Sequence, residues 1–292
     1  MRDHADSGPL FTAFSQFAQA GGMRWHVQRA GSGPVLLLLH GTASASHSWR
    51  HLLPTLARQY TVIAPDLPGH GLSSDPGTHG LSLPGMSRLL ARLLRHLGVQ
   101  PAFIVGHSAG AALAVRLCLD GAVAPQRLIA LNGALLPPLG MPLHLFSPLA
   151  KLLAVTPLVP QLFSLRARGP QAVERLLDGT GSRRDPVMLD FYRRLLGESA
   201  HVAGALRMMA WWDLPALAHH LPKLQVPLDL LVADGDRIIP PAEAVRIQAL
   251  LPQARTVVLP GLGHLAHEED PATCLRVLQA CLTHKEPQEC MP

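Results

Sequence analysis

The stretch Phe103-Ile104-Val105-Gly106-His107-Ser108-Ala109-Gly110-Ala111-Ala112 decides the fold of this chain. It opens with an apolar run typical of a buried strand, is interrupted at Gly106, and continues after Gly110 with residues that favour a helix. A serine between two glycines at such a strand-to-helix turn has its hydroxyl exposed at the top of a sheet, as in the Gly-x-Ser-x-Gly motif. Ser108 is therefore the candidate nucleophile.

Apolar runs on both sides of this stretch predict further strands, and they alternate with segments of helical periodicity. A continuous apolar run such as residues 34–39 is typical of a strand covered on both faces. The alternation predicts an α/β fold with a mostly parallel, doubly wound sheet. The expected strands are 23–28 as an edge strand, then 34–39, 60–65, 103–105, 127–132, 228–233 and 255–259, and the expected helices are 49–58, 83–97, 109–120, 241–251 and 271–282.

The alternation stops between residues 134 and 222, where short helical segments are broken by proline and glycine. We interpret residues 134–222 as a helical lid inserted into an α/β core made of residues 1–133 and 223–292. Residues 128–150 carry no Asp, Glu, Lys or Arg, but they contain prolines, which remove backbone donors that lipid cannot replace: Pro137, Pro138, Pro142 and Pro148. The sequence thus predicts no transmembrane segment.

A serine nucleophile needs a general base, and the base needs an acid that orients it. Two polar residues beyond Ser108 come just after predicted strands, Asp236 after 228–233 and His264 after 255–259. The carboxyl ends of parallel strands meet at one edge of a sheet, where such folds place their sites. We therefore predict Ser108 as nucleophile, His264 as general base and Asp236 as the buried acid.

Three other residues compete for these roles. Asp234 is the alternative acid, although it also suits a turn-capping role before Gly235. His267 is a weaker rival base, because a solvated or helix-start histidine explains it equally well. Asp66 precedes the serine in the chain, and the Pro-Gly-His-Gly that follows it predicts a rigid turn.

The oxyanion of an acyl-transfer reaction needs two donors, and we predict the backbone amides of Ala109 and Thr42 for this role. His40, beside Thr42, reads as a structural tether between loops. An apolar lid rich in Leu, Pro, Phe and Trp favours a bulky apolar substrate, although core packing explains most of its leucines equally well. The candidate substrate-contact residues are His40, His107, Trp211 and Trp212.

Several other function classes are disfavoured. The 16 histidines include no H-E-x-x-H motif, and no phosphate loop or dinucleotide fingerprint is present, so we expect neither a metal nor a cofactor. The net charge of +5 comes from scattered basic residues, expected on solvated faces, which argues against nucleic-acid binding: for example Arg183, Arg184, Arg193 and Arg194. The first residues lack a signal-peptide apolar region, so a cytoplasmic location is expected.

These motifs together resemble the α/β-hydrolase superfamily over nearly the whole chain: His40-Gly41, the segment from Asp66 to Gly71, Gly106 to Gly110, the Asp236 turn and Gly263-His264. More narrowly, several stretches are similar to the BchO group, α/β hydrolases described as magnesium-chelatase accessory proteins of bacteriochlorophyll biosynthesis. Those stretches are 22–28, 131–137, 146–153, 201–206 and 211–214. The resemblance implies cytoplasmic work in phototrophic tetrapyrrole metabolism, with a tetrapyrrole and magnesium chelatase as the implied partners.

Three hypotheses for the function follow. The first is a serine hydrolase of an ester or related acyl bond on a bulky apolar substrate. The second is a non-catalytic accessory protein that holds a porphyrin or a chelatase subunit, an idea that rests on the family association alone. The third is a cofactor-free haloperoxidase-like perhydrolase with the same triad. A serine at position 108 disfavours the haloalkane dehalogenase and epoxide hydrolase chemistries, in which related proteins use an aspartate nucleophile.

Overall fold

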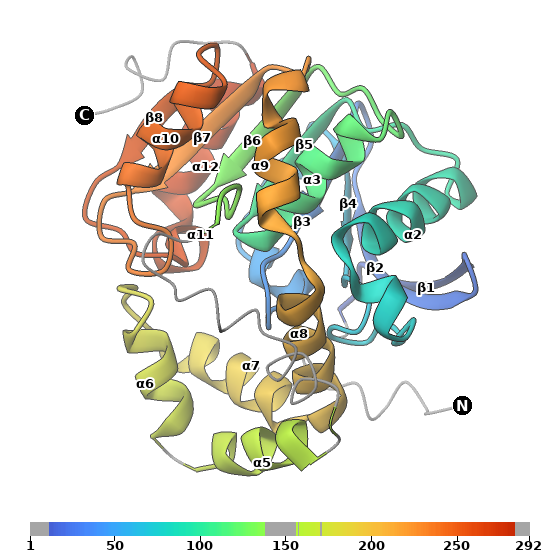
Figure 1. The fold of residues 1–292 in the computed structure, drawn as a ribbon, viewed down its shortest axis with the longest axis vertical. Coiled ribbons are helices and arrows are strands. Elements are labelled where there is room, and N and C mark those ends of the chain that lie inside the picture. Colours follow the sequence, from blue (N-terminus) through green and yellow to red (C-terminus); the bar gives the residue numbers. More distant parts are fainter. Residues whose placement is uncertain (1–11, 138–155, 157, 170, 284–292) are drawn as a thin grey trace.

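An eight-stranded sheet forms the centre of the computed structural model, which describes residues 12–137, 156, 158–169 and 171–283 (Figure 1). Neighbouring strands from β4 to β8 run parallel, while β2 is antiparallel to both β1 and β4. The predicted mostly parallel sheet is therefore confirmed. In the order of the sheet, the strands are β1 Ser15–Ala20, β2 Met23–Ala30, β4 Thr61–Pro65, β3 Val35–Leu39, β5 Phe103–His107, β6 Arg127–Leu131, β7 Leu228–Ala233 and β8 Arg255–Leu259.

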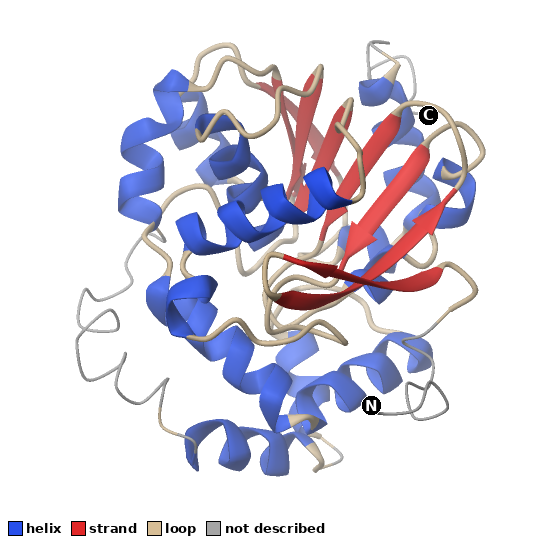
Figure 2. Ribbon diagram, turned by 90° about the vertical axis from the view of Figure 1, so that its right-hand side faces the viewer, coloured by secondary structure: helices blue, strands red, loops and turns tan. Residues whose placement is uncertain are grey.

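Helices cover both faces of the sheet, and Figure 2 shows them on either side of the twisted strands. In β3, Leu37 and Leu39 belong to one buried apolar cluster, whereas Leu36 and Leu38 belong to the other. Every position of this strand is apolar because both of its faces are covered. The first cluster takes side chains from α2 Leu83–His96, α3 Ala109–Leu119, α9 Leu214–His220 and α10 Ala242–Leu250, and the second from η2 Ser46–Trp49, α1 Leu53–Leu56 and α12 Pro271–Leu282.

The edge of the sheet differs from the prediction. Residues 23–28 do not form the edge strand, because β1 pairs with the outer side of β2. Gly21 and Gly22, with φ of 63° and 79°, form the turn of this hairpin in a backbone region that glycine adopts readily. Only two positions of β1 are buried, so its sequence lacks the apolar run that marks the inner strands.

The helix expected over 49–58 is also broken, into η2 and the short α1. Pro54 lies in the first turn of α1, where its missing amide hydrogen breaks no helical hydrogen bond. The other predicted core helices match α2, α3, α10 and α12 to within one residue at each end. Two further short helices, η3 Thr78–Leu81 and α11 Ala266–Glu269, lie in connections.

Between β6 and β7, the described part of the chain is helical: α5 Leu158–Ala167, α6 Ala172–Asp178, α7 Pro186–Gly197, α8 Ser199–Trp211, α9 and η5 Leu221–Lys223. Figure 1 shows α5, α6 and α7 gathered beyond one end of the sheet, with α8 leading back towards it. We call residues 134–222 the inserted segment; the predicted boundaries at 133 and 222 stay a prediction. Leu217 of α9 shares the buried cluster of α3, so the end of this segment packs on the sheet layer.

The apolar stretch 128–150 is only partly described. Its beginning belongs to β6, as expected, whereas residues 138–150 lie outside the described part of the chain. Among the helices that the structure describes, none combines the length and the apolar character needed to span a bilayer.

Candidate active site

Ser108 lies where β5 ends and α3 begins, with φ 52° and ψ −119°, a conformation that costs free energy for any residue with a side chain. The flanking glycines permit this turn. A Cβ on Gly106 would come within 2.5 Å of Ala111 Cα, and one on Gly110 would clash with the carbonyl oxygen of Leu39. Larger residues at either position would push the helix away from the sheet, so the motif at 106–110 is required by packing.

Asp236 and His264 meet at the carboxyl end of the sheet. His264 Nδ1 lies 2.7 Å from Asp236 Oδ2, and both side chains are buried. The other carboxylate oxygen, Oδ1, accepts hydrogen bonds from the amides of Ile238 at 2.7 Å and Ile239 at 2.9 Å. Asp236 thus accepts the Nδ1 proton of His264, which leaves Nε2 as the nitrogen that could receive a proton from a serine. The structure brings the predicted acid and base together.

The described residues contain no hydrogen bond between Ser108 Oγ and the His264 ring. The serine-to-histidine contact of the predicted triad therefore stays a prediction. Catalytic hydrogen bonds of this kind are often long in the absence of substrate and shorten when it binds.

The competing residues occupy other positions. Asp234 Oδ1 accepts a hydrogen bond from the amide of Gly261 at 2.7 Å on the surface, which is the turn-capping role. His267 is fully buried, with its ring centre 4.7 Å from that of Trp49 and 4.5 Å from that of His107. Burial lowers the pKa of His267 to about 3, so it stays neutral near pH 7. These positions favour Asp236 and His264 over Asp234 and His267.

Two backbone amides predicted for the oxyanion lie close to the serine. Ala109 is the first residue of α3, and its amide precedes the hydrogen-bonded turns of the helix. Gly41, just before Thr42, passes so close to the predicted nucleophile that a Cβ there would lie 3.0 Å from Ser108 Cβ. In the described part of the chain, neither the Thr42 nor the Ala109 amide donates to a protein acceptor. Both amides remain available to a ligand.

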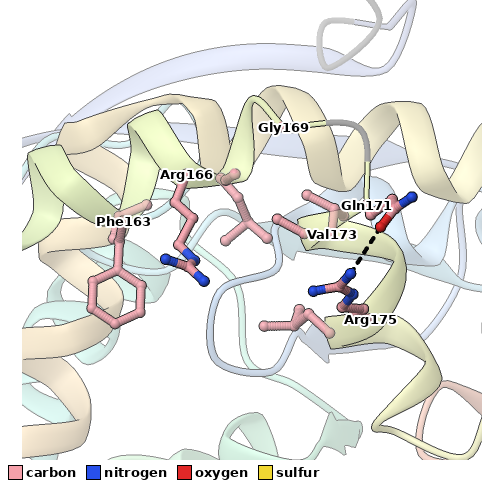
Figure 3. A pocket seen from close by; sticks show the side chains of 11 residues that line it. Phe163, Arg166, Gly169, Gln171, Val173 and Arg175 are labelled. Carbon is pink, nitrogen blue, oxygen red and sulfur yellow. Dashed lines mark hydrogen bonds between the residues drawn. The ribbon is translucent and has the colours of Figure 1, made fainter.

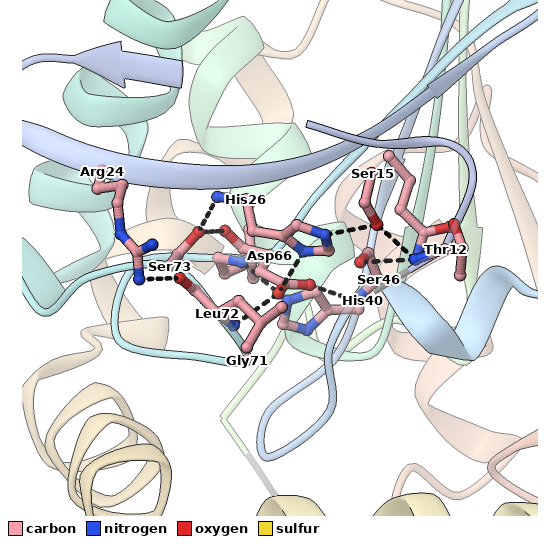
Figure 4. Close-up of polar contacts among 12 residues, drawn as sticks. Thr12, Ser15, Arg24, His26, His40, Ser46, Asp66, Gly71, Leu72 and Ser73 are labelled. Atoms are coloured by element: carbon pink, nitrogen blue, oxygen red, sulfur yellow. Dashed lines mark hydrogen bonds and ion pairs between the residues drawn. The ribbon is translucent and has the colours of Figure 1, made fainter. Parts of the chain in front are cut away.

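His40 and Asp66 form the framework of the loops beside the serine (Figure 4). His40 Nε2 accepts the amide hydrogen of Leu67 at 2.8 Å, and Nδ1 lies 2.8 Å from the carbonyl oxygen of Gly41. Burial lowers the pKa of His40, in keeping with the neutral ring that this pairing requires. Both nitrogens are occupied by backbone groups, so the structural role fits His40 better than substrate contact.

Asp66 is buried and accepts hydrogen bonds from the amides of Ser46 at 2.7 Å and Leu72 at 2.8 Å (Figure 4). Its Oδ2 also lies 2.8 Å from His26 Nδ1. Burial by itself raises the pKa of Asp66, but the charge and hydrogen bond of His26 and the Leu72 amide outweigh it, and the pKa lies well below its usual range. Sequence reasoning missed His26, because its partner is 40 residues away along the chain.

His107 and Asn132 hold the backbone of His264, the predicted general base. The His107 Nε2–H donates to the carbonyl oxygen of His264 at 2.9 Å, and the Asn132 amide nitrogen donates to the same oxygen at 2.9 Å. Asn132 Oδ1 accepts the amide hydrogen of Ala233 at 2.8 Å. One side chain thus joins the ends of β6 and β7 to the loop after β8 that carries His264. Asn132 lies in the stretch 131–137 that resembles the BchO group, but the sequence reasoning assigned it no role in the site; the structure holds it at φ 45°.

The predicted substrate contacts Trp211 and Trp212 lie beside η3. Trp212 Nε1 donates to the carbonyl oxygen of Leu81 at 3.0 Å, and the ring belongs to the buried cluster of α2 and α3. The ring centre of Trp211 lies 6.3 Å from that of His79. These polar and ring contacts join the end of α8 to η3, whereas His107 contacts His264.

The inserted segment touches the site directly at Thr180, Gly181 and Ser182. The Thr180 carbonyl oxygen accepts the amide hydrogens of His264 at 3.2 Å and Arg237 at 3.3 Å. Ser182 Oγ accepts the amide hydrogen of Leu265 at 2.8 Å. The turn therefore bridges the loop after β7, residues 234–241, which carries Asp236, and the loop after β8, residues 260–265, which carries His264; we call these the acid loop and the histidine loop.

The described residues include no group of three or more His, Cys, Asp or Glu side chains that could hold a metal ion. The four arginines expected on solvated faces each pair with a carboxylate: Arg183 with Glu269, Arg184 with Asp178, Arg193 with Glu174 and Arg194 with Asp190.

Comparisons with known proteins agree with this architecture. A family model described as the alpha/beta hydrolase fold matches residues 34–271. The chain is 39% identical over 252 residues to the "Magnesium-chelatase 30 kDa subunit" of Rhodobacter capsulatus, covering 86% of this chain and 88% of that protein. The expected resemblance to the magnesium-chelatase accessory group is thereby confirmed.

Two further similarities concern hydrolases. A "Soluble epoxide hydrolase" of Corynebacterium sp. is 39% identical over 115 residues, which cover 39% of this chain and 40% of that protein. The solved structure of a thermophilic esterase from Thermogutta terrifontis superposes with a TM-score of 0.73 at 23% identity, covering 93% of this chain and 99% of that one. The structural likeness bears on the fold alone.

Proposed function

Because the chain belongs to the α/β-hydrolase family, we propose that it is a serine hydrolase that cleaves an ester or related acyl bond of a bulky apolar substrate. The observation that carries the proposal is the buried pair of His264 and Asp236, 2.7 Å apart, at the same end of the sheet as the strained turn of Ser108. An imidazole oriented by a buried carboxylate near a serine is the arrangement that activates a hydroxyl for acyl transfer.

The proposed reaction has two halves. In the first, His264 Nε2 takes the proton of Ser108 Oγ as that oxygen attacks the acyl carbon, and the oxyanion accepts hydrogen bonds from the Thr42 and Ala109 amides. The same proton then goes to the leaving alcohol, and an acyl-serine forms. In the second half, His264 takes a proton from water, whose oxygen attacks the acyl carbon; returning this proton to Ser108 releases the acid.

Asp236 stabilises the imidazolium that forms in each half. The amides of Ile238 and Ile239 hold its second oxygen, so the carboxylate keeps its orientation while the charge on the ring changes. Support for a bulky apolar substrate comes from the leucine-, proline- and aromatic-rich composition of the inserted segment.

A fluorophosphonate probe tests the proposal, because it phosphonylates an activated serine far faster than an ordinary hydroxyl group. We expect stoichiometric labelling of the wild-type protein at Ser108, found by peptide mass spectrometry, and none in Ser108→Ala. A folded wild-type protein that stays unlabelled over hours would contradict the hydrolase proposal.

The relative named as a magnesium-chelatase subunit favours a second candidate, a non-catalytic accessory protein that holds a tetrapyrrole or the chelatase itself. The two candidates differ in what Ser108→Ala does to pigment synthesis in a strain that depends on this protein. A pigment-deficient alanine strain supports catalysis, whereas wild-type pigment levels support the accessory role.

A further inference from the structure

A cavity of about 510 Å³ lies within the inserted segment, apart from the candidate active site (Figure 3). The residues that line it come from α5, α6, α7, α8 and the turn between α5 and α6, and no strand of the sheet contributes. Its volume is in the range of pockets that hold small molecules. Val173 and Val202, both buried, form apolar walls, whereas Phe163, 55% exposed, lies at the open side.

The polar groups of this cavity carry one sign of charge. Arg166 and Arg175 line it, and no Asp or Glu does. Figure 3 shows both guanidinium groups directed into the same space between α5 and α6. Gln171 Oε1 accepts a hydrogen bond from Arg175 at 2.8 Å, which orients that guanidinium without neutralising it.

Most other arginines of the inserted segment behave differently. Five of the six pair with carboxylates, namely Arg183, Arg184, Arg193, Arg194 and Arg207, whereas Arg168 donates to the carbonyl oxygen of Gly197 at 3.4 Å. In the described part of the chain, Arg166 and Arg175 form no such ion pair. Two unneutralised cations on one apolar cavity create a local preference for an anion that is attached to an apolar body.

We propose that this cavity binds a small apolar molecule that ends in an anionic group, with a carboxylate as the fitting chemistry. The apolar body contacts Val173 and Val202, and the carboxylate lies between the guanidinium groups of Arg166 and Arg175, which suit planar carboxylates. The proposal is independent of the hydrolase proposal, because none of the lining residues belongs to the predicted triad or oxyanion donors.

Two fluorescent probes of matched shape test the site: 1-pyrenebutyrate, which carries a carboxylate, and 1-pyrenebutanol, which is neutral. Binding to the full-length Ser108→Ala protein is followed by fluorescence titration, so that turnover cannot interfere. We expect the double variant Arg166→Gln/Arg175→Gln to bind pyrenebutyrate at least about tenfold more weakly. Each lost ion pair at an exposed position should account for roughly threefold to fivefold of this affinity. Pyrenebutanol binding should change less than about twofold.

Arg168→Gln is the matched control, because it removes the same charge two residues from Arg166 without lining the cavity. It should leave both affinities unchanged. Ala172→Phe fills the cavity and should weaken both probes, with unchanged circular dichroism showing that the fold is intact.

Pyrenebutyrate that binds the double arginine variant as tightly as the parent overturns the proposal. So does an equal loss in Arg168→Gln, which would indicate a general charge effect, or undiminished binding of both probes to a folded Ala172→Phe protein. None of these outcomes bears on fluorophosphonate labelling of Ser108, so failure here and failure of the hydrolase proposal are distinguishable.

Discussion

The carbonyl oxygen of Thr180 accepts the backbone amide hydrogen of His264 at 3.2 Å, so the inserted segment directly contacts the loop that carries the proposed general base. The neighbouring Gly181, with φ of 80°, packs against Gly235 in the acid loop, where a Cβ would clash with the Gly235 carbonyl oxygen. These two contacts couple any displacement of the inserted segment to the geometry of the predicted acid and base.

Gly181→Ala should weaken this coupling. Its positive φ and the clash with the Gly235 carbonyl oxygen cost about 1–3 kcal/mol of folding free energy, measured by urea unfolding. We also expect a loss of kcat on an ester substrate, because the acid loop must move. Gly179→Ala is the control, since its φ of −62° suits any residue; an equal loss there would show that the effect is not specific to the contact with Gly235.

Asn132→Ala should lower activity without touching the reacting groups. It leaves the buried Gly263 carbonyl oxygen and Ala233 amide without their side-chain partner, at a cost of about 1–3 kcal/mol, while the His264 carbonyl oxygen keeps only its bond from His107. Thermal unfolding gives the stability loss, and kcat reports on His264. A folded Asn132→Ala variant with wild-type kcat would show that Asn132 does not position His264.

The assignment of the acid is tested by a pair of matched variants. Asp236→Asn should reduce kcat by about ten-thousandfold, because the amide no longer stabilises the correct tautomer of His264. Asp234→Asn should change kcat by less than about threefold, since Asp234 only caps the turn at Gly261. The reverse pattern of losses would make Asp234 the acid.

Buried neutral histidines predict a loss of stability in mild acid. Burial lowers the folded-state pKa of His201 to about 4 and that of His267 to about 3, whereas the unfolded value is 6.5. Below pH 6.5 the unfolded chain binds protons that the folded protein does not, so their contribution is present above pH 6.5 and is lost as the pH falls. Each histidine should lower the free energy of unfolding by about 2 kcal/mol between pH 7 and pH 5.

His267→Phe isolates one of these contributions, because both nitrogens of His267 lack hydrogen-bond partners among the described residues. The variant should lose less stability than the wild type on going from pH 7 to pH 5, by urea unfolding at both values. His219→Gln, at an exposed position, is the control and should follow the wild-type dependence. An unchanged slope in His267→Phe would show that His267 does not remain neutral in the folded state.

Local patterns in the sequence were sufficient for seven of the eight strands and for the strand-to-helix turn at Ser108, whereas the roles of Ser108, Asp236 and His264 stay predictions. Apolar runs and glycine spacing act within a few residues, so they can be read without knowing what lies opposite. The family followed from the same motifs. The edge strand β1 was not predicted, because only two of its positions are buried and it lacks an apolar run. Its pairing with β2 cannot be inferred from its own sequence.

Only the tertiary structure decided what surrounds the predicted triad. Three sets of contacts join residues that are 40 to 132 positions apart along the chain. They are the bond of His26 to Asp66, the bonds of Asn132 to the loop of His264, and the contact of Thr180 with His264. The same holds for the ion pairs of the inserted segment, in which Arg166 and Arg175 take no part among the described residues, and for the cavity that these two arginines line. Such contacts depend on how helices and loops pack, and a one-dimensional pattern holds no distance between them. The sequence by itself determined which residues could do chemistry; packing decided which of them are held in place to do it.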